Sequence, residues 1–440
     1  MEGKGTVLNS ELDLFREDPL EGQMEVRETL TLPPLSNEYS SNITFDIRND
    51  QDQCYIDSSR IYLEADVGIQ KYNATSSKWV SIAKDDKIFP INNLLHSMFK
   101  DVEVQLNGKV INENNGTYPF LAYLTFLLSY GENYLECQGK SFGWIKDTAG
   151  EMDTVDVAAD SPRLGRHMKF IDSGDDTYHD QVVLGRLVGE VFQQERYLPH
   201  GTDLRIVLRR TSDAFLLMGE NAGKQRLVIK TIVFHVDYVK IDPTLYLQHK
   251  TLHLKQNMII PIRRRVIKTF NIPSGTYTQT INTLFTDVLP QRLVLCMTTN
   301  QAFNGAHNKN PFNFGHFGLT ELKVNYGGRY VPKKPYKPDF GKERYTRSYM
   351  SLFQGTDKLD KNEDIPITYE EYPDGFTMWC YDFTADNGGA DNVLHTTQKG
   401  TLTIDVTFGT ALTAAVTLLA YAEYENKLEI DHTNNVYSNY

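Results

Sequence analysis

The sequence has few cysteines, no long apolar run and no catalytic signature. Its four cysteines, Cys54, Cys137, Cys296 and Cys380, lie far apart, and no two have the C-x-x-C spacing of a zinc or redox site. We therefore expect reduced thiols in an intracellular protein. No stretch approaches the roughly 20 apolar residues that a membrane helix needs, and the N-terminus lacks the apolar core of a secretory signal peptide.

The acidic charge balance excludes one broad class of function. The 440 residues include 45 basic and 57 acidic side chains, which give a formal net charge of −12. This balance argues against a general nucleic-acid coat that follows phosphates, but it leaves room for a local basic patch. With 40% apolar and 23% charged residues, the composition is globular, and the length allows one large domain or two medium ones.

Short segments in which apolar and polar residues alternate recur along the chain. Val102–Leu106, Leu322–Tyr326 and Leu402–Phe408 each place their apolar side chains on one face, which is typical of half-buried strands. The turn-forming pairs Asn107-Gly108 and Gly327-Gly328 follow two of them. Many short strands separated by such turns predict an all-β sandwich or barrel.

One segment favours a helix. Tyr118–Tyr130 is largely apolar, carries Pro119 in what would be the first turn, and is followed by Gly131. Its length and these end signals predict a helix, and another buried strand is the alternative.

The sequence also repeats itself. Five stretches of the first half match five stretches of the second half in the same order, and chance matches should not be collinear. The pairs are Ser59–Leu63 with Gln291–Leu295, Val102–Lys109 with Leu322–Arg329, Tyr123-Leu124 with Tyr349-Met350, Gly201–Ile206 with Gly400–Ile404, and Val236–Asp242 with Ala422–Asp431. The offset falls from 226 to 199 residues between Tyr123 and Gly201. The first half therefore has extra residues there, including the acidic stretches Asp147–Asp160 and Asp172–Asp180, and we expect a long solvated loop or tower.

The duplication sets the domain organisation that we expect. Each unit would hold about eight strands and one helix, and eight strands in two Greek keys make a jelly roll. The expected fold class is all-β: two tandem eight-stranded jelly-roll β-sandwiches, a double jelly roll, with long loops and short helices. The limits are an N-terminal arm at 1–23, a first jelly roll at 24–246 with a long loop insertion at about 131–200, and a second jelly roll and C-terminal tail at 247–440. A single large irregular β-domain is the alternative.

Two stretches resemble ligand sites, and a structural explanation is favoured for both. Gly219–Lys224 resembles a phosphate-binding loop, but its glycine spacing is one residue short and Gln225 stands where Ser or Thr would hold magnesium. We expect a turn between strands there. An acidic cluster offers oxygen ligands for calcium but lacks the spacing and closing glutamate of an EF-hand, which favours a solvated loop. The cluster consists of Asp172, Asp175, Asp176, His179 and Asp180.

Histidines and basic runs offer further candidates. His96 and His316 have related positions in the two halves, and we expect satisfied structural histidines rather than a metal pair. The basic runs Arg263–Arg265 and Lys333-Lys334 have the charge to contact phosphate or an acidic arm, but a solvated or intersubunit salt-bridging role is favoured. Aromatic side chains at strand spacing are expected in the core and at interfaces rather than stacked on sugars or bases. We therefore assign no catalytic, cofactor-binding or metal-ligating residue and expect a protein that assembles, not an enzyme.

Several longer stretches resemble a known family of virus proteins. They are Asn93–Phe99, Val102–Gly108, Lys146–Asp153, Pro261–Arg264, Ala302–Gly305, Asn310–Phe314, Arg347–Phe353, Tyr421–Asn426 and Glu429–Asp431. In combination they are similar to the double-jelly-roll major capsid proteins of double-stranded DNA viruses, and more specifically to the capsid-type proteins of Polinton/Maverick elements and adintoviruses. The resemblance covers most of the chain from about residue 40 onward.

The resemblance implies a function and partners. Proteins of this family form trimers whose six jelly rolls give a pseudo-hexagonal, hexon-like capsomer, and these capsomers tile an icosahedral shell around a double-stranded DNA genome. The implied partners are further copies of the chain in the homotrimer and in neighbouring capsomers, penton and minor capsid proteins, and packaged DNA at the inner surface. The implied location is the virion capsid, assembled inside the host cell, and neither a cofactor nor a small-molecule substrate is expected.

Two alternatives remain open. One is the penton, or vertex, protein of such a particle, although the duplication argues against it because vertices usually use one roll. The other is a carbohydrate-binding or carbohydrate-cleaving β-sandwich, which would need paired carboxylates across a cleft that sequence spacing does not reveal.

Overall fold

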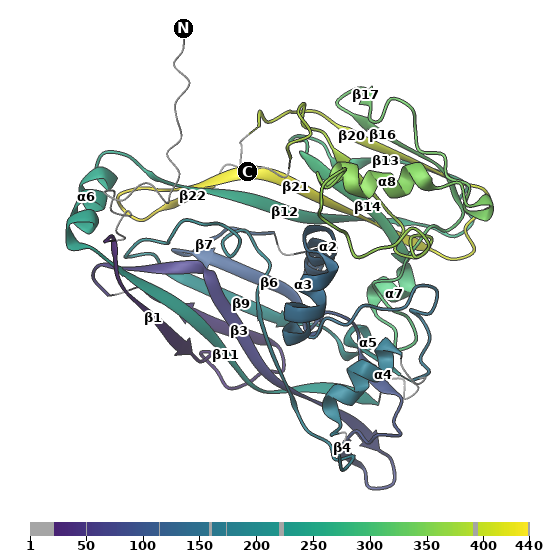
Figure 1. Ribbon diagram of the computed structural model, residues 1–440, viewed down its shortest axis with the longest axis horizontal. Helices are drawn as coiled ribbons and strands as arrows, with labels where there is room; N and C mark the ends of the chain where they lie inside the picture. Colours follow the sequence, from purple (N-terminus) through teal and green to yellow (C-terminus); the bar gives the residue numbers. More distant parts are fainter. Residues whose placement is uncertain are drawn as a thin grey trace, which may run out of the picture.

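The chain folds into two groups of strands that follow one another in sequence. The computed structural model describes residues 22–49, 51–113, 115–157, 161–172, 174–219, 224–389 and 395–438. The first group ends with Ile241 and the second begins with Met258. They form the lower and upper parts of the molecule in Figure 1. Of the predicted arm, residues 1–21 lie outside the described ranges, in which no helix is both long and apolar enough to cross a membrane.

The first group is a sandwich of two antiparallel sheets. One sheet has the order β1 (Met24–Leu32), β11 (Gln225–Ile241), β3 (Cys54–Asn73), with β8 (Gln181–Arg186) and β4 (Lys78–Ser81) sharing the outer edge of β3. The other has the order β2 (Asn42–Ile47), β9 (Leu204–Arg210), β6 (Phe99–Leu106), β7 (Lys109–Val110). Alternate residues such as Ile61, Leu63 and Phe45 point between the sheets and are fully buried.

The second group repeats this arrangement. One sheet has the order β12 (Met258–Ile272), β21 (Val416–Ile430), β14 (Arg292–Thr299), β19 (Met378–Asp382), with β22 (Val436–Ser438) paired to β21. The other has the order β13 (Thr278–Phe285), β20 (Leu402–Phe408), β16 (Leu319–Tyr326), β17 (Arg329–Tyr330). The two rolls have the same strand order once their main strands are numbered one to eight along the chain. In the first roll these strands are β1, β2, β3, β6, β7, β8, β9 and β11, and in the second they are β12, β13, β14, β16, β17, β19, β20 and β21. Both rolls then have one sheet of order 1-8-3-6 and one of order 2-7-4-5. Two such Greek keys are a jelly roll, so the predicted double-jelly-roll fold class is confirmed.

The matched sequence stretches lie in corresponding strands with the same register. Ile61 pairs with Val236 in the first roll, and their counterparts Leu293 and Ala422 pair in the second. The hairpin after β6 turns at Asn107 and Gly108, and the one after β16 turns at Gly327 and Gly328. All four residues have positive φ, from 48° to 93°, as the two-residue turn with matching twist requires. The internal repeat is therefore a structural duplication.

The helices are more numerous than the one per unit that we expected. They are α1 (Leu94–Ser97), α2 (Tyr118–Ser129), α3 (Glu132–Cys137), α4 (Pro162–His167), α5 (Asp213–Leu216), α6 (Pro243–His253), α7 (Asn300–Asn304) and α8 (Thr346–Gly355). Three 3-10 helices, η2 (Gln138–Phe142), η3 (Met168–Phe170) and η4 (Phe340–Lys342), and the short strands β5 (Ile88–Pro90), β10 (Leu217–Gly219), β15 (Phe314–Gly315) and β18 (Asp374–Gly375) complete the described elements. The predicted helix at Tyr118–Tyr130 is confirmed as α2, and its repeat counterpart is α8.

The expectation of a solvated loop at about 131–200 is wrong for most of the segment. It contains β8 and several short helices, and Phe142, Trp144 and Phe170 are at most 4% exposed. Asp147, expected in a solvated stretch, is buried in an ion pair with Arg166. Although the segment is rich in acids, its helices cover the flank of the first roll, and burial of their apolar side chains there stabilises the segment.

The linker between the rolls contains a helix that the sequence reading missed. The side chain of Asp242 accepts hydrogen bonds from the backbone N–H groups of Thr244 (2.8 Å) and Leu245 (3.2 Å), and Pro243 occupies the first position of α6. An Asp-Pro pair is a strong helix-start signal because the side chain satisfies free N–H groups and proline has none to satisfy.

Candidate functional site

The contact between the two rolls is built around α2. This helix lies between the sandwiches (Figure 1), and ten of its twelve residues are buried. Tyr123 stacks in parallel on Phe312, with ring centroids 4.1 Å apart, and Phe120 stacks on Phe303 at 5.4 Å. A helix that is apolar all round needs cover on every side. The second roll supplies part of that cover, so the two rolls form one packed unit.

Strand β14, in the sheet β12–β21–β14–β19 of the second roll, is buried on both faces. Leu293 and Leu295 of β14 point into the core of their own sandwich, while Val294 and Cys296 point the other way. All four are at most 3% exposed. Val294 and Cys296 belong to the same apolar cluster as α2 and the first roll's core, so the first roll and the helices beside it cover this outer face.

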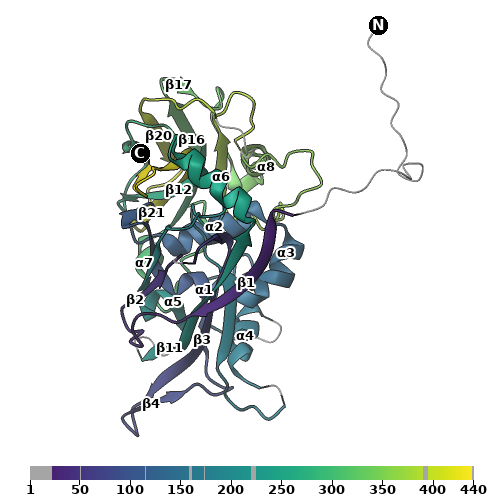
Figure 2. The same ribbon diagram turned by 90° about the vertical axis from the view of Figure 1, so that its left-hand side faces the viewer.

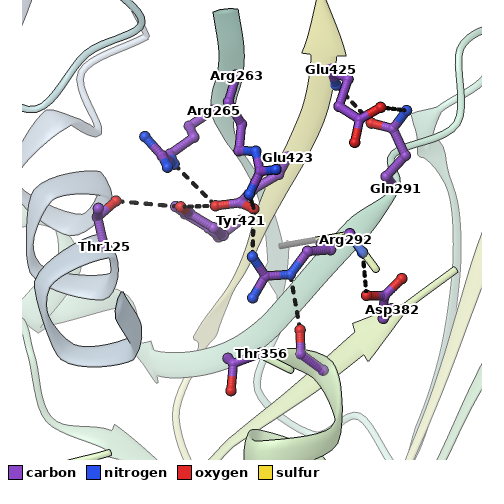
Figure 3. Close-up of polar contacts among 12 residues, drawn as sticks. Thr125, Arg263, Arg265, Gln291, Arg292, Thr356, Asp382, Tyr421, Glu423 and Glu425 are labelled. Atoms are coloured by element: carbon purple, nitrogen blue, oxygen red, sulfur yellow. Dashed lines mark hydrogen bonds and ion pairs between the residues drawn. The ribbon is translucent and has the colours of Figure 1, made fainter. Parts of the chain in front are cut away.

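A buried ion cluster lies at one end of the covered face (Figure 3). The carboxylate of Glu423 accepts hydrogen bonds from Arg292 Nη1 (2.8 Å), Arg265 Nε (3.0 Å) and the hydroxyl of Tyr421 (2.7 Å). The Tyr421 hydroxyl lies 3.3 Å from Thr125 Oγ1 on α2, which links the cluster to the first roll. These geometrically specific bonds hold the cluster together within the second roll, and the Tyr421–Thr125 contact connects it to α2.

The arginines of the cluster keep the buried carboxyl of Glu423 ionised. Burial alone would raise the pKa of the Glu423 carboxyl, but attraction by Arg292, Arg265 and Arg263 outweighs it and holds this pKa far below its usual range. Glu423 is therefore ionised at neutral pH.

A second buried acid near the same arginines behaves in the opposite way. Glu190 is 6% exposed, and burial raises its pKa to about 7 against a weaker opposing attraction from Arg265. Both residues line a cavity of about 30 Å³ between the rolls, a space that can hold one water molecule. Glu190 is thus a group of the roll–roll contact that titrates near neutral pH.

The first roll has a corresponding acid on its own outer sheet. Asp237 occupies the place in the repeat that Glu423 has in the second roll. It accepts hydrogen bonds from Arg27 Nη1 (3.0 Å) and Thr29 Oγ1 (2.5 Å), and Arg27 also binds Asp57 at 2.8 Å. The side chain of Arg27 is 34% exposed, against 13% for Arg292. The acids are buried in both rolls, and the difference lies in the arginine, which is more exposed in the first roll than in the second.

The open sheet also carries exposed apolar side chains. Tyr62 of β3 is 41% exposed, and Val182 and Leu184 of β8 are 60% and 37% exposed. Beside them, Tyr130 and Tyr134 stack at 4.3 Å and line a groove of about 260 Å³ together with Tyr62 and Leu184. We call the face formed by Tyr62, Tyr130, Tyr134, Val182 and Leu184 the open face. Contiguous exposed apolar side chains of this kind mark interaction surfaces.

The prediction that the basic run Arg263–Arg265 is solvated or forms salt bridges between subunits needs correction. These arginines pair within the chain, and their side chains are at most 21% exposed. Arg265 binds Glu423 and Gln193, Arg264 binds Glu113, and Arg263 lies 3.9 Å from Glu423. The sequence reading missed Glu423 itself, although an acid at the same place in both repeats was a signal that could have found it.

The remaining sequence candidates stay apart from this contact. His96 is fully buried, and its Nδ1 bonds the Tyr118 hydroxyl at 3.0 Å while its Nε2 has no partner among the described residues. His316 stacks on Phe340 at 4.1 Å, and its Nδ1 accepts a hydrogen bond from the backbone N–H of Gly318 (2.9 Å). Lys333 and Lys334 are exposed. In the stretch Gly219–Lys224, β10 ends at Gly219 and β11 begins at Gln225, and residues 220–223 lie outside the described ranges.

The acidic cluster of the first roll is a surface turn. Asp172, Asp175, Asp176 and His179 are exposed, and Asp172 and Asp175 accept hydrogen bonds from backbone N–H groups of the same turn. Within the described residues, no three or more His, Cys, Asp or Glu side chains are grouped as a metal site would require. The solvated loop that we expected for this stretch is what the structure has.

The strand order, the duplication and the packed contact define a double-jelly-roll protein. The chain is similar over 99% of its length to a chain of the Sputnik virophage structure determined by cryo-EM, with a TM-score of 0.65, 12% identity and 93% of that chain covered. It is also similar to the mavirus major capsid protein (TM-score 0.57, 11% identity, 99% of this chain and 96% of that chain). A third solved relative is the capsid protein of the PBCV-1 virus (TM-score 0.57, 13% identity, 97% of this chain and 99% of that chain). These likenesses establish the fold.

Sequence comparison adds one relative. An uncharacterised protein of Caenorhabditis elegans, F54H12.2, is 24% identical over 303 residues, which are 68% of this chain and 69% of that protein. No protein-family profile matches the chain.

Proposed function

We propose that this chain is a major capsid protein of the Polinton/Maverick and adintovirus type. Three copies would form a pseudo-hexagonal capsomer, and capsomers would tile an icosahedral shell around double-stranded DNA. Solved structures with a similar fold include the PBCV-1 virus capsid and the mavirus major capsid protein, which supports the proposal. We also propose the domain limits 24–246 and 247–440, which the separation of the sheets supports.

The observation that carries the proposal is the contrast between the covered and the open face. Within one chain, the outer face of the second roll's sheet packs beside α2 of the first roll. The corresponding sheet of the first roll keeps its open face. The same kind of contact repeated between chains would place another copy on that face. Such head-to-tail contacts close into a ring when the rotation permits, and three chains then supply six rolls.

The repeat also indicates which surface of the next copy would dock. The counterpart of α2 is α8, whose Tyr349, Met350 and Phe353 are half-buried on the flank of the second roll. We place the α8 flank of one copy against the open face of the next. Each contact would be modest, and closure of the ring would make the set stable.

The proposed role is structural, not enzymatic. The partners would be copies of the chain in the trimer and in neighbouring capsomers, together with penton and minor capsid proteins and DNA at the inner surface. The place of action would be the virion capsid, assembled inside the host cell.

The test is the mass and outline of the purified full chain. Light scattering after size exclusion should give about 150 kDa, three times the chain mass of 50.3 kDa, and negative-stain images should show a hexagonal outline. A double variant, Val182→Asp with Leu184→Asp, should remain folded and lose the trimer, because it places two charges at the open face. The control is Tyr277→Asp, which changes a residue that is also 60% exposed but lies elsewhere.

The outcomes separate the alternatives. A wild-type pentamer would replace the proposal with the vertex protein. A wild-type monomer at every protein concentration tested would overturn it and return attention to a carbohydrate-binding sandwich. A trimer that survives the double variant unchanged would show that the open face is not the interface.

A further inference from the structure

A wide groove lies beneath α6, where the chain passes from the first roll to the second. Its volume is about 830 Å³. Tyr197, Ile241, Leu245, Met258 and Ile260 are among the residues that line it, so its floor is largely apolar. In Figure 2, α6 runs close to the beginning of β1. The groove belongs to neither the roll–roll contact nor the open face.

The rim of the groove leaves apolar side chains in solvent. Leu252 of α6 is 49% exposed, Ile259 46% and Met24 42%, and all three line the groove. Polar residues usually occupy such positions on a monomer's surface, so three large apolar side chains around one groove indicate that another segment covers them.

Three basic side chains and one acidic side chain are among the polar residues that line the groove. Arg196, His249 and His253 line it, and Glu429, its acidic residue, is paired with Lys427 at 2.7 Å. Both ring nitrogens of His253 are buried and have no hydrogen-bond partner among the residues that the structure describes. An occupant with carboxylates would satisfy these donors.

The chain itself provides an occupant of this chemistry. Gln23 and Met24 line the groove, so the 22 residues before Gln23 start from its rim. Residues 1–21 carry six acidic and two basic side chains, and the groove offers Arg196, His249 and His253 as hydrogen-bonding partners for carboxylates. Their apolar residues alternate with the acids and include Leu12, Leu14 and Phe15. Phe15 precedes Gln23 by eight residues, which span up to about 28 Å when extended, enough to turn back into the groove.

We propose that the groove beneath α6 binds the chain's own N-terminal segment Glu11–Leu20. Leu12, Leu14 and Phe15 enter between α6 and the strand ends, and the neighbouring carboxylates face Arg196, His249 and His253. Docking within one chain is favoured because the tether keeps the segment at a high effective concentration. The inference does not depend on the capsid role and would hold for a monomer.

The first experiment uses a deletion variant that starts at Gly22 and a labelled peptide of residues 1–22. The variant should bind the peptide saturably in fluorescence anisotropy, and the full chain should bind it at least tenfold more weakly because its own segment competes. A peptide with Leu12→Asp, Leu14→Asp and Phe15→Asp should lose at least tenfold in affinity. The matched control peptide, with Thr6→Asp, Asn9→Asp and Ser10→Asp, gains the same charge without losing apolar side chains and should still bind.

Variants of the groove keep the test informative if the deletion variant fails to fold. In the full chain carrying Leu14→Asp and Phe15→Asp, the free groove should again bind the wild-type peptide. Adding His249→Glu and His253→Glu should abolish that binding, whereas Lys333→Glu with Lys334→Glu, a charge change elsewhere on the surface, should not. The proposal would be overturned if the peptide showed no saturable binding. It would also be overturned if the wild-type full chain bound the peptide as tightly as the Leu14→Asp, Phe15→Asp variant.

A crosslink decides whose segment occupies the groove. Phe15→Cys and Leu252→Cys are placed in one chain together with Cys137→Ser, which removes the exposed native thiol. A short bismaleimide should join the two cysteines within one chain and leave the denatured mass at that of a monomer. Crosslinks only between chains would overturn docking within the chain and assign the groove to a neighbour's segment.

Discussion

The sheets β1–β11–β3–β8 and β12–β21–β14–β19 have the same strand order but different surroundings. Their inward positions match in character: Ile61 and Leu63 in one correspond to Leu293 and Leu295 in the other. Their outward positions do not. Tyr62 corresponds to the buried Val294, and Glu64 to the buried Cys296. After a duplication, the inward positions of both sheets stay apolar because each sandwich needs a core. The outward positions differ because only one sheet is covered by another part of the chain.

The difference is visible in the sequence once the comparison is known. Arg60–Val67 alternates between polar and apolar residues, as strands with one wet face do, whereas Arg292–Met297 is apolar almost throughout, as strands buried on both faces are. The apolar run was therefore a sign that the second roll's sheet lies inside the molecule.

The sharpest way to break the comparison is to place one charge at the two corresponding positions. Val294→Asp should cost about 5 kcal/mol or more, because it buries a carboxylate without a partner, and the protein should fail to accumulate in folded form. Tyr62→Asp should change the stability of the isolated chain by only about 1 kcal/mol. Urea denaturation of both variants measures this, with Val294→Thr as a milder control. Equal losses would show that the two faces are covered to the same extent.

Much of the fold was predictable because its signals are local. Alternation located the central strands, the two-glycine and Asn-Gly turns located the hairpins, and collinear matches revealed the duplication. The helix at Tyr118–Ser129 followed from its end signals. These features depend on neighbours in sequence, which a single chain displays directly.

The parts that sequence reading missed depend on contacts between distant residues. The basic run Arg263–Arg265 looked like a surface patch because its main acidic partner, Glu423, is about 160 residues away in sequence. The segment around Trp144 looked solvated because the acidic, turn-rich stretch Asp147–Asp160 follows it, but Asp147 is paired with Arg166. Pairing across such distances is set by the tertiary fold and leaves no periodic trace.

The duplicated acids give a second, smaller test. Glu423→Gln should cost about 3–5 kcal/mol, because it leaves buried arginines without a counter-charge. Asp237→Asn, at the corresponding place, should cost about 1 kcal/mol, since Arg27 keeps Asp57 at 2.8 Å and contact with solvent. Chemical denaturation at pH 7 compares the stability of the two variants.

The matched control is Glu429→Gln. Glu429 lies on the same strand as Glu423, but its side chain is 27% exposed, so this variant should have little effect on stability. If Asp237→Asn proves as costly as Glu423→Gln, the greater exposure of Arg27 does not lower the cost.

The smallest effect concerns the two acids that share Arg265. The pKa of Glu190 is raised to about 7 from 4.5, so between these values the folded chain holds a proton that the unfolded chain has lost. The stability due to this group is fully present below about pH 4.5 and is lost as the pH rises through 7. Glu190→Gln should remove that loss and make the protein more stable by up to about 3 kcal/mol at pH 8.5, with little change at pH 4.5. Urea midpoints across this pH range measure the difference in stability.

Glu423 behaves in the opposite sense. Because its pKa is lowered, it contributes stability at pH values above the ordinary pKa of a glutamate, and that stability is lost only in acid. Parallel pH profiles for wild type and Glu190→Gln would show that Glu190 is ionised and paired like Glu423, and the distinction between the two acids would fail.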